Sequence, residues 1–131
     1  MKLFLILLLF FVFLSCDSRE KRMLQTGLWA IEEVEIEGEV YDYRYLYDNL
    51  LSFEKNGKGS GFIFRNSPFL SNHFYWDFLD GGSSGNDSIE VHMSNNEFLN
   101  RIFQVDFYTK NTVPYLILTS LDVKIKCFKY I

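Results

Sequence analysis

The sequence predicts an all-β fold, a small antiparallel up-and-down β-barrel of about eight strands. Two observations predict it. Phe, Tyr, Trp, Ile and Val, which favour strands, dominate the chain after its first segment. They form runs of five to nine residues that Gly, Asn, Asp and Ser interrupt at short intervals. Connections this short join antiparallel neighbours, and so many strands in a small domain close into a barrel or pack as a sandwich, of which we favour the barrel.

The expected strands follow one another with few residues between them. In the first, which spans 28–36, the alternation of apolar side chains changes phase near Glu32 and Glu33, and this indicates a β-bulge or a sharp bend. The other expected strands span 40–45, 50–55, 58–65, 73–79, 88–93, 101–108, 115–120 and 123–130.

Turn-forming residues separate these strands. Asn56-Gly57 lies between the strands at 50–55 and 58–65, and this pair is typical of a tight type I′ hairpin turn. Further loops are expected at 66–72, 80–87, 111–114 and 120–122, with a short helical turn as one option for 95–100.

The N-terminus carries a positive charge, a short apolar run and a cysteine, in that order. Lys2 precedes twelve apolar residues at 3–14. This run is shorter than the about 20 residues of a membrane-spanning helix and is typical of a secretory signal. The segment Phe13-Leu14-Ser15-Cys16 resembles the bacterial lipobox, in which a small residue precedes a cysteine that is lipidated before cleavage. The sequence therefore predicts a lipoprotein anchored through Cys16, with an ordinary secretory signal or an uncleaved anchor as alternatives.

This interpretation divides the chain into three parts. They are a signal peptide at 1–15, the lipidated cysteine and a polar tether at 16–26, and one barrel domain at 27–131. A protein of this kind belongs to the bacterial cell envelope, and we favour the outer membrane over the inner one, although Asp17 after the cysteine is compatible with both. The lipid provides the membrane contact, because more than one acyl chain gives lasting attachment.

The charge and the cysteines limit the partners. The formal net charge is −4 and becomes −5 when Lys2 leaves with the signal peptide, so the domain is acidic, which argues against nucleic acid. Lipidation of Cys16 leaves Cys127 without an internal disulfide partner, whereas an ordinary signal would permit a Cys16–Cys127 bridge. Cys127 lies within an apolar alternation, so we expect a buried, inert thiol in a monomeric domain without a cofactor.

Several short motifs resemble those of bacterial lipocalin-like lipoproteins. Gly27-Leu28-Trp29 is similar to the G-x-W of the first lipocalin strand, and 51–59 is similar to an F-x-x-x-G-x-G hairpin of that group. The other similar parts, within a resemblance that covers 27–130, are Trp76, 115–118 and 126–129. The resemblance implies a barrel that holds a small apolar molecule. The chain lacks the lipocalin motif between the sixth and seventh strands and is shorter than most lipocalins.

One face of each strand must fill the interior of such a barrel, which has room for side chains or for one small ligand. The candidate ligand-binding residues on this face and at the rim are Trp29, Tyr43, Tyr45, Phe53, Phe62, Phe64, Trp76 and Phe103. Further inward candidates are Phe78, Val105 and Phe107. The alternative is a filled core, with Trp29 as a plug at a closed end.

Four tyrosines are spaced by two residues, so on a strand they would share one face. They are Tyr41, Tyr43, Tyr45 and Tyr47. Tyrosine combines apolar area with a polar group and is frequent at recognition surfaces. This face is interpreted as a rim for a ligand, as a patch for a partner protein, or as the amphipathic side of a strand over the barrel end.

We expect neither a catalytic nor a metal site. His73 and His92 form no H-x-H or H-x-x-x-H pair, and the chain contains neither a nucleophile elbow nor a phosphate-binding loop. The acids that alternate from Glu33 to Glu39 are typical of a solvated face, and 80–87 lacks the spacing of a calcium loop.

Two functions remain. The first is a non-catalytic binder of a small apolar or amphipathic molecule, within or at the mouth of the barrel. The second is a cell-envelope interaction module with a filled barrel, whose tyrosine-rich outer surface binds a protein or glycan. The first requires a cavity of a few hundred Å³, and the second requires an exposed apolar patch.

Overall fold

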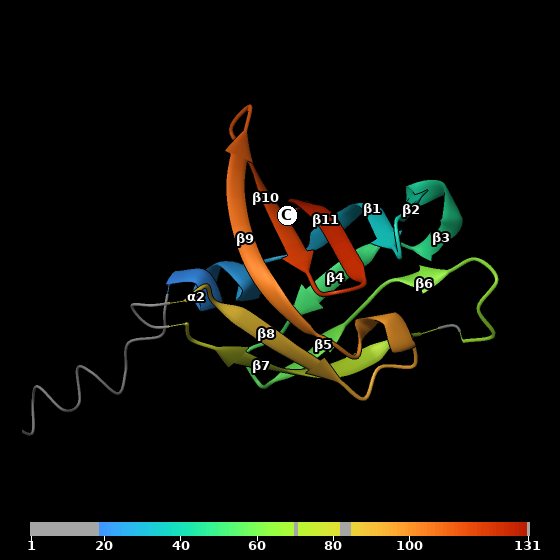
Figure 1. The fold of residues 1–131 in the computed structure, drawn as a ribbon, viewed down its shortest axis with the longest axis horizontal. Coiled ribbons are helices and arrows are strands. Elements are labelled where there is room, and N and C mark those ends of the chain that lie inside the picture. Colours follow the sequence, from blue (N-terminus) through green and yellow to red (C-terminus); the bar gives the residue numbers. More distant parts are fainter. Residues whose placement is uncertain (1–18, 70, 82–84, 131) are drawn as a thin grey trace, which may run out of the picture.

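The computed structural model describes residues 19–69, 71–81 and 85–130, so the predicted signal peptide and Cys16 lie outside it. Within this part the chain forms a closed antiparallel β-barrel with a short helix at one end (Figure 1). The predicted all-β barrel is therefore confirmed. None of the helices in the described part is long and apolar enough to cross a membrane.

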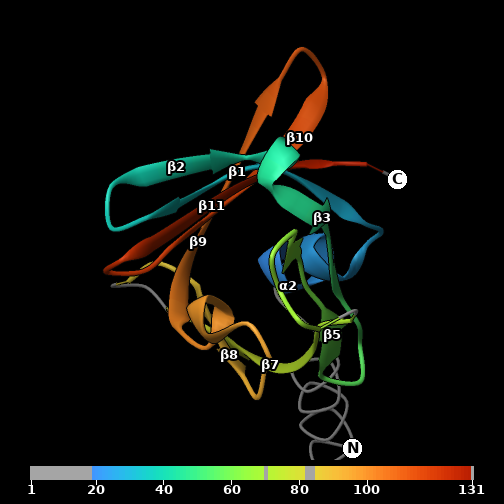
Figure 2. The ribbon, with the colours of Figure 1, turned by 90° about the vertical axis from the view of Figure 1, so that its right-hand side faces the viewer.

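Eight strands close the barrel. Each pairs antiparallel with the next barrel strand along the chain, and the last pairs with the first. Figure 2 shows the strands winding around a common interior. The strands are β1 (Trp29–Ile36), β4 (Leu50–Phe53), β5 (Lys58–Ser60), β7 (His73–Leu79), β8 (Ser88–His92), β9 (Ile102–Lys110), β10 (Val113–Thr119) and β11 (Val123–Lys129).

β1 pairs with two different strands on one edge. Its first two residues pair with β4, and the stretch from Glu33 pairs with β2 (Glu39–Asp42). On its other edge β1 pairs with β11, and the register shifts between Ile31 and Glu33. The bulge predicted near Glu32 is therefore confirmed, and it bends β1 where the strand passes from one neighbour to the other.

The remaining elements lie at the two ends of the barrel. α2 (Arg19–Gln25) covers the end at which β1 begins, which we call the helix end. The opposite end, called the loop end, carries the β5–β7, β8–β9 and β10–β11 connections. There the 3₁₀ turn η1 (Tyr43–Tyr45) leads to β3 (Leu46–Asp48), which pairs with β6 (Ile63–Phe64). The β8–β9 connection contains a second 3₁₀ turn, η2 (Glu97–Leu99). It lies within 95–100, where the sequence predicts a short helical turn as one option.

The turn between β4 and β5 differs from the predicted type I′ turn. Gly57 has φ +82°, but Asn56 does not adopt a positive φ. The main-chain N–H of Glu54 donates to the Lys58 carbonyl at 2.8 Å, so the loop has three residues. The indole N–H of Trp76 donates to the carbonyls of both Glu54 and Lys58 at 3.0 Å. This contact from β7 holds the two carbonyls in place and favours the wider loop.

The strand predicted at 40–45 ends early, so the prediction of a shared tyrosine face is wrong. The carboxylate of Asp42 accepts a hydrogen bond from the main-chain N–H of Arg44 at 3.0 Å and pairs with the Arg44 guanidinium at 2.6 Å. Asp42 thereby caps η1, and the chain leaves the strand after it. Tyr43 and Tyr45 consequently lie in η1, whereas Tyr41 lies on β2 and Tyr47 on β3.

Aromatic side chains occupy the barrel interior. Phe53 makes edge-to-face contacts with Phe74 and Trp76, at centroid distances of 5.7 and 5.3 Å. The predicted inward residues that are buried are Trp29, Phe53, Phe62, Trp76, Phe103 and Val105. Those that are half-buried and pack against this core are Phe64, Phe78 and Phe107. The interior is therefore packed with side chains from strands all around the barrel.

Trp29 and α2 close the helix end. Leu24 and Trp29 are fully buried, and the indole N–H of Trp29 donates to the Leu24 carbonyl at 3.3 Å. The segment predicted as a tether at 16–26 thus contains, from Arg19, a helix that packs onto the barrel.

Cys127 on β11 is a free, fully buried cysteine, as predicted. Burial raises the pKa of its thiol far above the ordinary value, with the negative charge of Glu32 as a second cause. The thiol therefore stays protonated and has no access to reagents in the folded protein.

The β9–β10 turn holds a β-branched residue in the left-handed region. Asn111 (φ +52°) and Thr112 (φ +66°) lie between the paired residues Lys110 and Val113. This conformation costs an L-residue about 1–2 kcal/mol, and glycine avoids the cost. We expect Thr112→Gly to raise the free energy of unfolding by about 1 kcal/mol in urea titrations. Thr112→Ala keeps the strained backbone and should leave stability nearly unchanged, so an equal gain in both variants would contradict this explanation.

Candidate functional site

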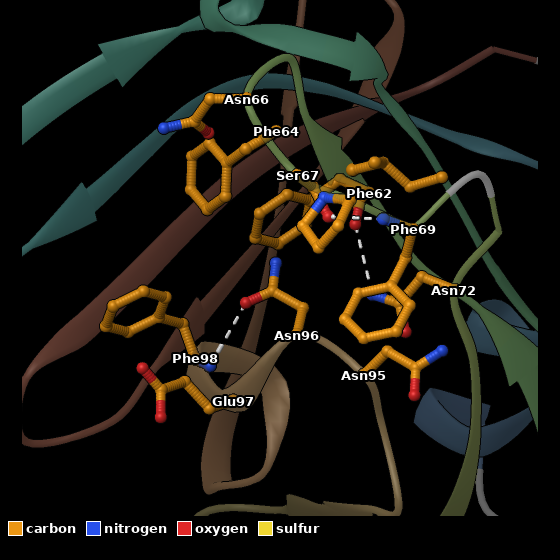
Figure 3. Close-up of a pocket in the computed structure, with 12 residues that line it drawn as sticks. Phe62, Phe64, Asn66, Ser67, Phe69, Asn72, Asn95, Asn96, Glu97 and Phe98 are labelled. Carbon is orange, nitrogen blue, oxygen red and sulfur yellow. Dashed lines mark hydrogen bonds between the residues drawn. The ribbon is translucent and has the colours of Figure 1, made fainter.

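A groove of about 370 Å³ lies at the loop end, between the β5–β7 connection and the β8–β9 connection (Figure 3). Two kinds of side chain dominate its walls. The aromatic ones are Phe62, Phe64, Phe69 and Phe98. The amides are Asn66, Asn72, Asn95 and Asn96. Both connections contribute residues of both kinds, and the pairing of β7 with β8 places these connections side by side.

The phenylalanine rings stand at right angles to one another. Phe62 and Phe64 are 5.2 Å apart at 89°, and Phe64 and Phe98 are 6.4 Å apart at 87°. These are edge-to-face contacts, which aromatic pairs prefer. Phe62 is fully buried and anchors the wall, whereas Phe69 is 48% exposed. The groove therefore presents both ring faces and ring edges to a bound molecule.

Asn72 joins the two connections. Its amide N–H donates to the Phe62 carbonyl at 3.1 Å, and its Oδ1 accepts from the Ser94 hydroxyl at 2.6 Å. Its own carbonyl accepts from the main-chain N–H of Gly61 at 2.8 Å. Asn72 is only 4% exposed, and these hydrogen bonds offset the free-energy cost of burying its polar amide. Its role is to hold the groove in shape.

Asn96 leaves one polar group unpaired. Its Oδ1 accepts from the main-chain N–H of Phe98 at 3.1 Å and so caps η2. Its Nδ2 is shielded from solvent and has no hydrogen-bond partner within the residues that the structure describes. Figure 3 shows this nitrogen directed toward the opposite wall of the groove, near Phe62. A buried donor without a partner costs about 1–3 kcal/mol. An acceptor atom of a ligand would relieve this cost if the side chains that shield the nitrogen moved aside.

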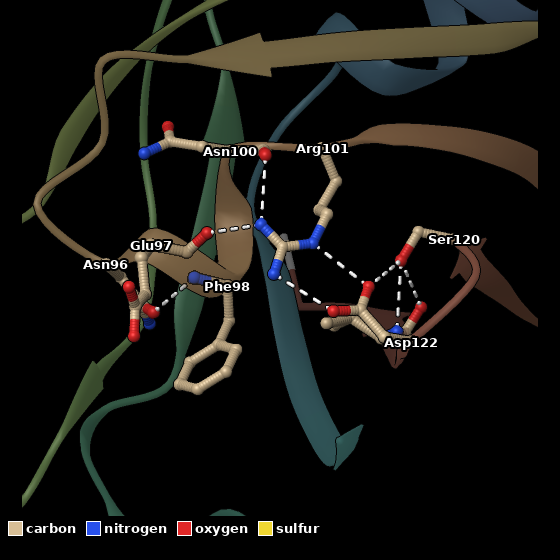
Figure 4. Close-up of polar contacts among 8 residues, drawn as sticks. Asn96, Glu97, Phe98, Asn100, Arg101, Ser120 and Asp122 are labelled. Atoms are coloured by element: carbon tan, nitrogen blue, oxygen red, sulfur yellow. Dashed lines mark hydrogen bonds and ion pairs between the residues drawn. The ribbon is translucent and has the colours of Figure 1, made fainter. Parts of the chain in front are cut away.

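Arg101 fixes the β8–β9 connection against the β10–β11 turn (Figure 4). Its Nε and Nη2 donate to the two carboxylate oxygens of Asp122 at 3.0 Å, and its Nη1 donates to the Glu97 carbonyl at 2.7 Å. These hydrogen bonds from Arg101 hold the pKa of Asp122 below its usual range, although desolvation acts in the opposite direction. The pair thereby positions η2, which carries one wall of the groove.

Most of the predicted ligand-binding residues do not reach the groove. Four of them lie in the barrel interior, namely Trp29, Phe53, Trp76 and Phe103. Both indole N–H groups donate to main-chain carbonyls, so neither is available to a ligand. Cys16, the predicted lipidation site, lies outside the described residues.

The other four predicted residues lie at the loop end. Phe62 and Phe64 line the groove, and Tyr45 lines a neighbouring hollow. Tyr43 is 59% exposed in η1 and does not line the groove. The structure thus brings three of the predicted residues together around Phe64.

The sequence interpretation did not identify Phe69, Asn96 and Phe98. They lie in connections without apolar alternation, where periodicity carries no information. A signal was nevertheless present, because Asn96 precedes Phe98 by two residues, as a capping residue precedes a short helical turn.

The groove offers apolar surface and hydrogen bonds. Within the described ranges no group of three or more His, Cys, Asp and Glu side chains could hold a metal ion. His92 and Asp77 lie 3.9 Å apart on the outer face of the barrel, where both are exposed to solvent. The groove itself presents aromatic rings and amide groups.

No protein-family model, curated protein or solved structure matches this chain. Because a barrel fold is compatible with many functions, the function is inferred from the geometry of the loop end.

The contact between Arg101 and Asp122 predicts a pH dependence of stability. Since the pKa of Asp122 is lowered in the folded state, its contribution is present above the unfolded pKa and is lost as the pH falls through the folded one. We expect Asp122→Asn to lower the free energy of unfolding at neutral pH, and the difference from wild type to shrink in acid. Urea titrations across the acidic range measure this, with the exposed Glu90→Gln as control. A difference that persists unchanged in strong acid would exclude the explanation.

Proposed function

We propose that this chain is a non-catalytic binding protein of the lipocalin-like lipoprotein type, which holds a small amphipathic molecule in the groove at the loop end. One observation carries the proposal: the groove that four phenylalanine rings line also contains Asn96, whose amide nitrogen has no hydrogen-bond partner among the described residues. The apolar part of the ligand lies against Phe64, Phe69 and Phe98. An acceptor atom of the ligand meets the Asn96 N–H after the side chains that shield this nitrogen move aside.

The volume of the groove and the fixed positions of the connections that form it support this assignment. Its volume of about 370 Å³ falls within the range of about 300–1,000 Å³ that is common for ligand pockets. Mostly apolar walls with a few placed polar groups are also common in such pockets. Asn72 and Arg101 already hold the two connections in place, so binding requires little ordering of the chain.

The barrel interior is a weaker candidate than the groove. Phe53, Trp76 and Phe103 lie there at 3% exposure or less and pack against neighbouring side chains. Protein interiors are packed like organic crystals, so a ligand could enter only by displacing these rings. The site expected from the lipocalin-like resemblance is therefore proposed at the mouth of the barrel.

Cys16 is proposed as the lipid anchor, and the bacterial outer membrane as the location. The described chain begins at Arg19, in the helix that covers the helix end. A lipid on Cys16 would bring this end toward the bilayer. The groove, at the opposite end, would then face away from the membrane and toward dissolved ligands.

A second candidate function is docking of a protein or glycan on the outside of the loop end. Tyr43, Tyr45 and Tyr47 are more than half exposed there, and Leu121 at the tip of the β10–β11 turn is fully exposed. Exposed aromatic side chains are frequent in recognition surfaces. This candidate requires no cavity and is compatible with the packed interior.

Native mass spectrometry distinguishes the two candidates. The full chain carrying Cys16→Ser, purified gently from its own host, should show an additional small-molecule mass that disappears on denaturation. A ligand-free mass at every collision energy would count against a tightly held molecule and would favour the docking function.

A substitution at the rim of the groove should weaken small-molecule binding. We expect phenylnaphthylamine, a neutral fluorescent amphiphile, to bind the full chain carrying Cys16→Ser. Adding Phe69→Ala removes one ring and should raise its dissociation constant about fivefold, or about 1 kcal/mol. The matched control is Tyr130→Ala, because Tyr130 is a similarly exposed aromatic residue at the helix end. Equal effects of the two substitutions in fluorescence titrations would rule out the groove as the site.

Lipidation is tested by metabolic labelling with an alkyne-tagged palmitate. The wild-type chain should carry the label and sediment with membranes, and Cys16→Ser should lose both properties. Cys127→Ala is the control for the second thiol, and it should retain the label because Cys127 is buried. Labelling that survives Cys16→Ser would refute the anchor.

A further inference from the structure

A second hollow, of about 250 Å³, adjoins the groove between η1 and β6. Its lining is aromatic and basic, and consists of Tyr41, Arg44, Tyr45, Phe64, Arg65 and Asn66. Phe64 and Asn66 line the groove as well, and Figure 3 shows them at its edge. A molecule that occupies the groove can therefore extend past Phe64 into this hollow.

The wall between the two sites is built from ring contacts. Tyr41 lies 6.0 Å from Phe64 and 5.6 Å from Tyr45, in edge-to-face arrangements of 74° and 87°. The hydroxyl of Tyr41 donates to the carboxylate of Glu39 at 2.7 Å, which raises the pKa of Tyr41. Tyr41 therefore remains neutral, and the wall is apolar with no charge of its own.

One of the two arginines is already paired within the protein. The guanidinium of Arg44 donates to the carboxylate of Asp42, with the shortest contact at 2.6 Å. These hydrogen bonds lower the pKa of Asp42 and raise the pKa of Arg44, so both groups stay charged and neutralise each other.

Arg65 has no such partner. Its main-chain N–H donates to the Tyr45 carbonyl at 3.0 Å, and its Nε donates to the Arg44 carbonyl at 2.6 Å. The second bond orients the side chain, but its acceptor is the neutral carbonyl oxygen of Arg44. In the described part of the chain, no carboxylate forms an ion pair with the guanidinium of Arg65. Among the residues that the structure describes, Arg65 is therefore the guanidinium of this lining that lacks a carboxylate partner, whereas the Glu39 carboxylate is bound to the Tyr41 hydroxyl. The two Nη groups of Arg65 form no hydrogen bond there.

We propose that the ligand of the groove is an amphipathic organic anion, whose carboxylate or other anionic group is bound by Arg65. This inference rests on the proposed binding function and adds the charge of the ligand to it. A planar guanidinium with two free Nη groups matches an oxyanion with two oxygens. The apolar body of the same molecule then lies along Phe64 and enters the groove.

Charge also sets the direction of the ligand. Glu97 lines the groove on the η2 side, so a negative group at that wall would be repelled. Arg65 lies on the other side of Phe64, and no carboxylate of the described residues pairs with its guanidinium. The anionic end of the ligand therefore lies at Arg65, and its uncharged end lies toward η2.

Two fluorescent probes with nearly the same rings test this inference. Anilinonaphthalene sulfonate is an anion, and phenylnaphthylamine lacks the sulfonate. Fluorescence titrations of both against the full chain carrying Cys16→Ser should give about fivefold tighter binding of the anion at low salt, the gain of a partly exposed charge pair. The preference should decrease as salt is added.

Substitutions assign the preference to one residue. Arg65→Gln should reduce the preference for the anion to about one, with little change in binding of the neutral probe. Arg65→Lys keeps the charge and should retain part of the preference. Lys110→Gln removes an exposed positive charge at the β9–β10 turn and serves as the control, with the preference unchanged. Near-UV circular dichroism of each variant verifies that the rings remain packed.

The outcomes distinguish a failure of the proposed binding function from a failure of the proposed anionic character of the ligand. If neither probe binds the folded chain, the proposed binding function is overturned. If both probes bind equally well, or if Arg65→Gln leaves the preference intact, binding at the groove stands and only the anionic character of the ligand is refuted.

Discussion

The pairing of β1 with β11 is the constraint on which the rest of the structure depends. Without it the barrel strands would form an open sheet with two unpaired edges, and their apolar faces would meet solvent there. The two strands pair from Trp29 opposite Lys129 to Ile36 opposite Val123, on both sides of the bulge. Closure also places Trp29 at the helix end, where α2 covers it.

Closure fixes the interior volume, and large side chains occupy it. At the helix end Leu24 and Trp29 are fully buried, so little surface remains there for a ligand. At the loop end the β5–β7 and β8–β9 connections are longer than a hairpin requires. Their additional residues form β6, η2 and the walls of the groove. Because side chains fill the barrel interior, the candidate site lies at the mouth of the barrel.

Sequence periodicity predicts the strands because one face of each must be apolar, and β7 (His73–Leu79) lies at its predicted bounds. The bulge near Glu32 is predictable for the same reason. The incorrect predictions concern contacts between side chains and main chain. The indole of Trp76 widens the turn at Asn56-Gly57, and the carboxylate of Asp42 ends a strand that the alternating tyrosines predict to continue. Neither contact leaves a periodic signal.

Asn72 and Asn96 show why the candidate site could not be predicted to the same extent. Both lie in connections without alternation of apolar and polar residues, and nothing in the sequence distinguishes the role of one from that of the other. Asn72 has partners for its amide on both connections, whereas Asn96 uses its oxygen as a cap and leaves its nitrogen unpaired. That difference arises because the pairing of β7 with β8 brings the β5–β7 and β8–β9 connections together at the loop end. Since the oxygen of Asn96 already caps η2, the group that a ligand would complete is its amide nitrogen alone.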